Sequence, residues 1–361
     1  MAHRRTSQRR VSGYKDILGW LALHHEATHS ELVRLISSAD AERLDYAMGL
    51  AREVAVENYG HGVFVRGLVE VSNRCAGGCY YCGLRAENSR VRRYSLSEEE
   101  IREACKKGYE LGLRSFVLQG GEVYDKAEMM ARVVRELKAE MPDAAVTLSL
   151  GEQDAEVYDL WRKAGADRYL LRHESATEEH YARLHPARMT FDNRQRCIAD
   201  LKALGYQVGA GFMVGLPFQG AEELAREVEY LVGLQPQMVG IGPYIPQCDT
   251  PFGDQKRGSV EQTLLMVALT RLALPKALIP STTALASSDQ QGMTRGILAG
   301  ANVVMPNITP LQYRADYAIY DGKKSSGTEA GEGLRQLQDK LQTIGYEAVL
   351  SRGDHLDFMK R

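Results

Sequence analysis

The sequence of 361 residues predicts an α/β fold, a (βα)8 TIM-type barrel that follows an N-terminal helical extension. Three observations support this prediction. Eight short runs of β-branched or apolar residues alternate with amphipathic segments from residue 63 onward. Several of the helical segments end on a glycine, which suits the left-handed position after a helix. The connections are short, which favours a parallel sheet, and eight such units are enough to close a barrel.

The chain divides into three parts in this interpretation. Residues 1–62 contain helix patterns at 17–25, 31–37 and 41–59 and few strand signals, so they form the helical extension. Residues 63–345 form the barrel, and residues 346–361 form a C-terminal tail.

The barrel elements follow from the periodicity of apolar residues. Strands are predicted at 63–71, 115–118, 145–150, 168–171, 208–214, 238–242, 278–282 and 302–305. Helices are predicted at 98–111, 127–141, 155–164, 192–204, 221–232, 260–274, 292–299 and 331–344. Ser97 and Glu100 have the spacing of a capping box at the start of the first of these helices. Reactive residues of such barrels lie at the C-terminal ends of the strands, so the residues after each strand are the candidate site.

Three cysteines, Cys75, Cys79 and Cys82, follow the first predicted strand in the spacing C-x3-C-x2-C. Thiolates at this spacing can ligate three irons of one [4Fe-4S] cube and leave the fourth iron open. The pattern resembles that of the radical S-adenosylmethionine (SAM) enzymes. In that superfamily SAM chelates the open iron and is cleaved to methionine and a 5'-deoxyadenosyl radical.

Zinc and disulfide interpretations of these cysteines fit less well. A structural zinc site needs four ligands, and the nearest additional candidate, His61, lies upstream of the predicted strand. Six cysteines are sparse for a disulfide framework in a chain of this length. The other three, Cys105, Cys197 and Cys248, stand alone, so no second cluster is expected.

Polar residues follow the other predicted strands as well. Gly120 and Gly121 would let a ligand approach the backbone closely, and the Glu122 carboxylate could accept a hydrogen bond from an ammonium group. The motif Arg172-His173-Glu174 ends the fourth strand, where a structural ion pair is the alternative to a ligand contact. A solvated surface position is the alternative for Arg194, and a buried helical stripe is the alternative for Tyr313, Tyr317 and Tyr320.

Longer segments resemble the HydE family of [FeFe]-hydrogenase maturases, radical SAM enzymes related to biotin synthase and methylornithine synthase. The resemblance spans about residues 60–320. It rests on CAGGCYYCGLR (75–85), LQGGE (118–122), VTLSLGE (146–152), AGADRYLLRHE (164–174), GAGFMVGLP (209–217), MVGIGPYIP (238–246), IPSTTA (279–284) and GANVVMPNITP (300–310).

The resemblance implies roles for individual residues. The three cysteines of the motif would ligate the [4Fe-4S] cluster. The SAM contacts would be Tyr81, Gly120, Gly121, Glu122, Ser149, Glu174 and Arg194. The substrate cavity would be lined by Arg172, Met238, Thr282, Thr283, Tyr317 and Tyr320.

The resemblance also implies a reaction and partners. The substrate would be a small cysteine-bound iron carbonyl–cyanide complex, or a thiol amino acid, used in assembly of the hydrogenase di-iron site. The partners would be a tyrosine lyase maturase, a GTPase scaffold maturase and an electron donor. Two alternatives stay open: an amino-acid mutase of the methylornithine synthase type, and a non-catalytic iron–sulfur or zinc binding module.

Composition narrows these options. The net charge of −2 gives no electrostatic reason to expect nucleic acid or a membrane as partner. Free thiols without an export signal predict a cytoplasmic location.

Two segments depart from the family pattern. Residues 322–331 are polar and carry no cysteine where some members have a second cysteine cluster, and residues 284–291 lack the glycines expected there.

Overall fold

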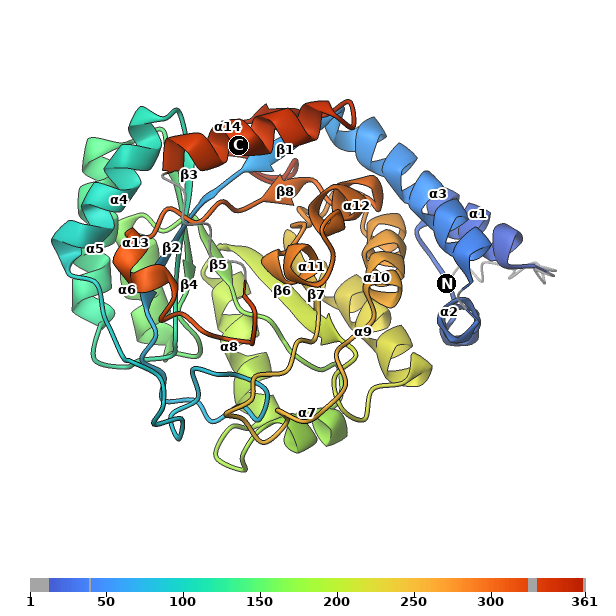
Figure 1. Cartoon of the computed structure of the whole chain (residues 1–361), viewed down its shortest axis with the longest axis horizontal. Coiled ribbons are helices and arrows are strands. Elements are labelled where there is room, and N and C mark those ends of the chain that lie inside the picture. Colours follow the sequence, from blue (N-terminus) through green and yellow to red (C-terminus); the bar gives the residue numbers. More distant parts are fainter. Residues whose placement is uncertain (1–12, 39, 324–329, 360–361) are drawn as a thin grey trace, which may run out of the picture.

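The computed structural model describes residues 13–38, 40–323 and 330–359, and its strands are all parallel (Figure 1). Six strands form one sheet in chain order: β2 (Gly67–Ser72), β3 (Ser115–Gly120), β4 (Ala145–Ser149), β5 (Arg168–Leu170), β6 (Gln207–Val214) and β7 (Met238–Pro243). A second sheet has the order β8 (Val303–Val304), β1 (Gly62–Val65) and β9 (Glu347–Val349).

Single backbone bridges join the two sheets into the predicted barrel. The chain bends at Arg66, so that β1 pairs with β8 while β2 pairs with β3. On the other side, Met238 of β7 bridges to Leu278, and Pro280 bridges to Val303 of β8. The prediction of a regular strand at 278–282 is therefore wrong. Proline lacks the N–H group that a strand ladder needs, and a helix begins directly after this segment.

Helices cover the outside of the barrel (Figure 1). They are α4 (Glu98–Glu110), α5 (Ala127–Glu140), α6 (Ala155–Ala164), α7 (Glu178–Leu184), α8 (Phe191–Ala203), α9 (Ala221–Leu234), α10 (Val260–Ala273), α11 (Thr283–Ser288), α12 (Gly292–Leu298), α13 (Leu311–Arg314) and α14 (Ala330–Gln342). The capping box of α4 is confirmed, since Ser97 and Glu100 each accept a backbone N–H bond from the other. The short helices α7, α11 and α13 were not predicted.

The N-terminal helices α1 (Tyr14–His24), α2 (His29–Ser37) and α3 (Ala41–Tyr59) pack beside α9 and α10 at one side of the barrel (Figure 1). Because α3 covers the outer face of α10, every residue from Thr263 to Ala273 is buried. No helix in the described ranges is long and apolar enough to cross a membrane.

Alternate strand residues point into the barrel, and several of those at its N-terminal end are polar. Arg168 is fully buried and donates to the Asp354 carboxylate at 2.5 Å, while Gln207 donates to the same carboxylate at 2.8 Å. Arg66 donates to the carbonyl oxygen of Gly353 at 3.3 Å. The segment after β9, which belongs to the predicted tail, thus closes this end of the barrel. The polar residues that follow the strands gather at the opposite end.

Candidate active site

The cysteine motif lies in a long loop between β2 and α4 that is held together by backbone contacts. Arg93 acts as an internal brace, because its guanidinium donates to the carbonyl oxygens of Asn73, Leu84, Arg85 and Asn88 at 2.6–3.0 Å. Sequence reasoning missed this residue, since an arginine in a polar loop carries no local signal of such a role.

The cysteine thiols are free and partly buried. The Cys75 sulfur accepts N–H bonds from Gly77 at 3.3 Å and from Glu122 at 3.4 Å, which connects the cysteine loop to the turn after β3. Burial raises the pKa of the Cys79 thiol and raises the pKa of Cys82 to about 12. Thiolates at these positions therefore need a cationic partner, and the irons of a cube would supply it. The donor set fits one [4Fe-4S] cluster.

The described residues contain no group of three His, Cys, Asp or Glu side chains that surrounds the position of a single metal ion. A cube differs from a single ion because its cysteine ligands bind separate irons.

Close packing explains the glycines after β3. A Cβ atom on Gly121 would collide with the carbonyl oxygen of Arg74, so only glycine lets this turn lie against the cysteine loop. Glu122 is almost fully buried and accepts hydrogen bonds from the Glu152 N–H at 2.8 Å and from the Tyr124 hydroxyl at 2.7 Å. Burial raises the pKa of its carboxyl group.

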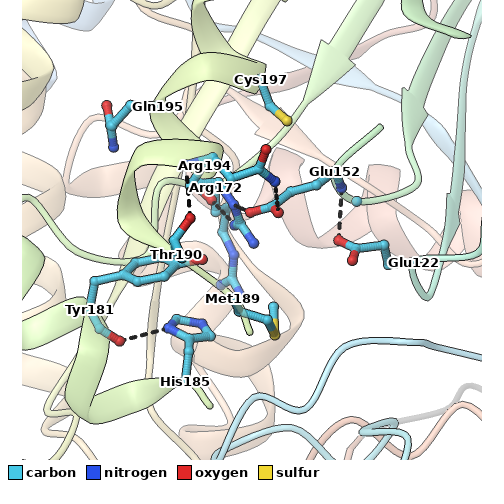
Figure 2. A network of polar contacts seen from close by, with 12 residues as sticks. Glu122, Glu152, Arg172, Tyr181, His185, Met189, Thr190, Arg194, Gln195 and Cys197 are labelled. Carbon is cyan, nitrogen blue, oxygen red and sulfur yellow. Dashed lines mark hydrogen bonds and ion pairs between the residues drawn. The ribbon is translucent and has the colours of Figure 1, made fainter. Parts of the chain in front are cut away.

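A network of two ion pairs runs from the end of β4 to the end of β5 beside this turn (Figure 2). The Arg194 Nε lies 2.5 Å from the Glu152 carboxylate, and Arg194 Nη1 donates to the carbonyl oxygen of Arg172 at 2.6 Å. Arg172 in turn pairs with Glu174 at 3.0 Å. Arg194 is therefore buried rather than a solvated surface residue. Sequence reasoning placed Glu152 at the C-terminal end of a strand but gave it no role in the site.

Glu174 shows two features of a ligand contact. Its backbone has a φ of 65°, a left-handed conformation that is uncommon outside glycine and concentrates at functional sites. Its Oε2 atom is buried and has no hydrogen-bond partner among the described residues, so it can accept a bond from a ligand hydroxyl or ammonium group. The site thus fits a polar cofactor such as SAM beside the cysteines.

The turn that carries Glu174 is held from outside the barrel. Glu227 of α9 is 1% exposed and accepts bonds from His173 Nε2 at 2.6 Å and from the Ala176 N–H at 3.0 Å. The other ring nitrogen of His173 accepts the N–H of Gly211 at 3.2 Å. His173 is therefore a neutral donor to Glu227.

Arg172 and Thr282 lie beside the two inward-facing glycines of β7. A Cβ atom on Gly240 would lie 3.8 Å from the Arg172 side chain, and one on Gly242 would lie 2.8 Å from the Thr282 hydroxyl oxygen. The same oxygen accepts the N–H of Leu285 and caps α11, which leaves the hydroxyl hydrogen available to donate.

The tyrosines at 313, 317 and 320 do not form a helical stripe, because α13 ends at Arg314. The chain then crosses toward the cysteine loop, where the carbonyl oxygen of Ile319 accepts the N–H of Gly83 at 3.0 Å. Tyr317 is buried and its phenol oxygen accepts a bond from Gln119, whereas the Tyr313 phenol donates to Glu100.

The remaining predicted residues lie in three places. Thr283 and Tyr320 are half-buried near α11, and Ser149 is half-buried at the end of β4. Met238 lies at the N-terminal end of β7, where its sulfur accepts a bond from Arg66 at 3.0 Å, so it is not at the rim with the others. Most of the cysteine-free stretch at 322–331, residues 324–329, lies outside the described residues.

Comparison with known proteins agrees with this geometry. The model of the radical SAM superfamily matches residues 69–231. The chain is 42% identical to the [FeFe] hydrogenase maturase subunit HydE of Thermotoga maritima over 299 residues, which cover 82% of this chain and 85% of the relative. It is 28% identical to 3-methylornithine synthase of Methanosarcina acetivorans over 301 residues, covering 81% and 83% of the two chains.

Two solved structures share the fold. The crystal structure of methylornithine synthase has a TM-score of 0.82 and 24% identity, and the match covers 95% of this chain and 99% of that chain. The maturase HydG from Carboxydothermus hydrogenoformans has a TM-score of 0.80 and 20% identity, with 93% and 79% covered.

The barrel, the cysteine loop and these matches define an enzyme of the radical SAM superfamily, as predicted. This superfamily combines a [4Fe-4S] cluster with SAM. Within it, the chain belongs to the HydE family of [FeFe]-hydrogenase maturases.

Proposed function

We propose that this enzyme cleaves SAM reductively and acts on a small cysteine-bound iron carbonyl–cyanide complex in assembly of the [FeFe]-hydrogenase di-iron site. The observation that carries the proposal is the placement of Arg172 and Thr282 beside the glycines of β7. A guanidinium and a hydroxyl at one position suit the carboxylate of an amino acid. A tyrosine lyase maturase would supply the complex, a GTPase scaffold maturase would receive the product, and a separate protein would donate the electron.

The cofactor contacts form the first part of the proposal. Cys75, Cys79 and Cys82 would hold a single cluster, which supplies the electron for SAM cleavage when SAM is bound. Glu174 would accept a bond from SAM through its unpartnered oxygen. The other proposed contacts to SAM are Tyr81, Gly120, Gly121, Glu122, Ser149 and Arg194.

The substrate contacts form the second part. Arg172 uses one terminal nitrogen for Glu174, and its remaining N–H groups could form two parallel bonds to a carboxylate. The hydroxyl groups of Thr282 and Thr283 would donate from the opposite side of β7. Tyr317 and Tyr320 would line the remaining wall, whereas Met238 bonds to Arg66 at the opposite end of β7 and is left out of the proposed cavity.

The amino-acid mutase remains the second candidate, because the chain also shares sequence and fold with methylornithine synthase. A lysine substrate would need an acidic partner for its ammonium group. The buried carboxylate of Glu70 on β2 could play that part, but Lys323 already pairs with it and Asn307 donates to it at 2.9 Å. This internal pair favours the maturase proposal.

An anaerobic SAM-cleavage assay with added amino acids tests the choice. We expect cysteine and thiazolidine carboxylates to raise the yield of 5'-deoxyadenosine, and lysine to leave it unchanged. Arg172→Lys should lose most of this stimulation, because an ammonium cannot form two parallel bonds. Arg135→Lys, at an exposed position on α5, is the matched control and should behave as wild type. Stimulation by lysine without stimulation by the sulfur compounds would establish the mutase instead.

A further inference from the structure

Residues 184–189, which connect α7 to α8, run along the cysteine loop and accept three of its hydrogen bonds. The carbonyl oxygen of Leu184 accepts the N–H of Tyr80 at 3.0 Å. His185 Nε2 accepts the hydroxyl of Tyr81 at 3.0 Å. The sulfur of Met189 accepts the N–H of Gly78 at 3.3 Å. The three donors lie on both sides of Cys79.

The geometry fixes the direction of the bond between His185 and Tyr81. The Nδ1 atom of His185 lies 2.9 Å from the carbonyl oxygen of Tyr181, which can only accept, so Nδ1 carries the proton. Nε2 is then an acceptor, and the Tyr81 hydroxyl is the donor. The imidazole is 2% exposed and stacks on the Tyr181 ring with centroids 4.0 Å apart. Burial lowers the pKa of His185 to about 3, which agrees with a neutral ring.

Residues 184–189 also pack directly against the cysteine loop beside these hydrogen bonds. A Cβ atom on Gly78 would lie 3.0 Å from the Pro186 ring, which is tighter than an ordinary contact, so the two segments pack closely at this glycine. Arg188 also pairs with Glu87 at the far side of the loop, at 2.7 Å.

We propose that residues 184–189 form a clamp that fixes the shape of the cysteine loop, and that His185 is a positioning residue that holds Tyr81 between Cys79 and Cys82. Cluster binding by this loop is part of the proposed function, and the inference rests on it to that extent. In the three hydrogen bonds around Cys79 the clamp supplies the acceptors and the loop the donors. The N–H groups of Gly78 and Tyr80 are thereby kept away from the cysteine sulfurs.

Hydrogen exchange of the full chain tests the clamp, both with the reconstituted cluster and without it. His185→Phe keeps an aromatic ring to stack on Tyr181 but removes the acceptor. We expect amides at 78–81 to exchange about five- to tenfold faster, the effect of losing one buried hydrogen bond. Tyr81→Phe removes the donor of the same bond and should give the same change. His185→Gln retains an acceptor and should recover part of the protection.

The double variant separates this bond from unrelated effects. If the two side chains act through one hydrogen bond, His185→Phe/Tyr81→Phe should exchange no faster than the faster single variant. His180→Phe is the matched control, since His180 is equally buried on α7 but contacts Ser175 and the carbonyl oxygen of Pro217. It should leave the exchange at 78–81 unchanged.

A second readout uses the cluster itself. Loss of iron from the reconstituted enzyme to a chelator should be several-fold faster in His185→Phe and Tyr81→Phe than in the His180→Phe control. Wild-type exchange at 78–81 in both single variants, or fully additive effects in the double variant, would overturn the clamp. The exchange measurement does not depend on any substrate, so failure of the maturase proposal would leave its result intact.

Discussion

The buried pair between Arg194 and Glu152 allows a test that separates structural from cofactor roles. Both side chains are 7% exposed, and Arg194 also donates to the carbonyl oxygen of Arg172. Arg194→Met removes the cation and leaves the Glu152 carboxylate buried with one remaining donor, Asn193 at 2.5 Å. Breaking a buried pair on one side destabilises a protein by about 3–5 kcal/mol. That is a large share of the roughly 5–15 kcal/mol that a domain has in total.

The double variant Arg194→Met/Glu152→Gln removes both charges and keeps an acceptor for Asn193. We expect it to recover all but about 1 kcal/mol, the contribution of the lost bond to the Arg172 carbonyl. Urea unfolding of the cluster-free chain, followed by fluorescence of the buried Trp161, measures these differences. Lys202→Met is the control on the same helix, since Lys202 is exposed and its bond to the carbonyl oxygen of Leu234 should contribute about 0.5–1.5 kcal/mol.

The affinity for SAM then decides the role of Arg194. If Arg194 contacts SAM, both the single and the double variant should bind SAM about ten- to hundredfold more weakly, the effect of losing a charged hydrogen-bond partner. Calorimetric titration of SAM into the reconstituted enzyme measures this. A double variant that regains both stability and wild-type SAM affinity would refute a direct contact and leave Arg194 a structural role alone.

Three further predictions concern other parts of the molecule. Glu227→Leu removes the acceptor of the buried His173 ring and of the partly buried Ala176 N–H, and should destabilise the protein by about 2–6 kcal/mol in urea unfolding. Glu229→Gln, exposed on the same helix, should change the free energy of unfolding by less than about 1 kcal/mol, and equal effects would contradict the reasoning. Hydrogen bonds to Glu222 and Glu229 raise the pKa of His29 in the folded protein. The stability that these bonds give the fold should therefore be fully present below the unfolded-state pKa of about 6.5, and it should be lost as the pH rises through the folded-state pKa. The stability difference between wild type and His29→Asn should thus shrink between pH 6 and 9, and a constant difference would exclude the linkage. Anaerobic reconstitution should give about four irons and four sulfides per chain, and Cys79→Ala should lose most of both; iron well above one cube would show a second cluster.

The sequence alone predicted the barrel architecture and the cysteine loop proposed to hold the cluster. Alternation of apolar runs with amphipathic segments is a local property, and it predicts strands, helices and their order. The spacing of Cys75, Cys79 and Cys82 is equally local, because all three thiols lie in one short loop, where they can ligate three irons of one cube. The parallel topology then brings the cysteines and Glu122 to the same rim, as the matches to radical SAM enzymes support.

Only the tertiary structure decided which polar side chains are buried and what they contact. Arg194 lies in an amphipathic helix where a solvated arginine is expected, yet it is buried against Glu152, 42 positions earlier in the chain. The contact between Tyr81 and His185 spans 104 positions, and the pair of Glu227 with His173 spans 54. No periodicity predicts such pairs, because each depends on where two distant helices or loops meet after the barrel has closed. A buried charge is stabilised by its partner in space, and that partner is set by the packing of helices against the sheet rather than by neighbouring residues in the sequence.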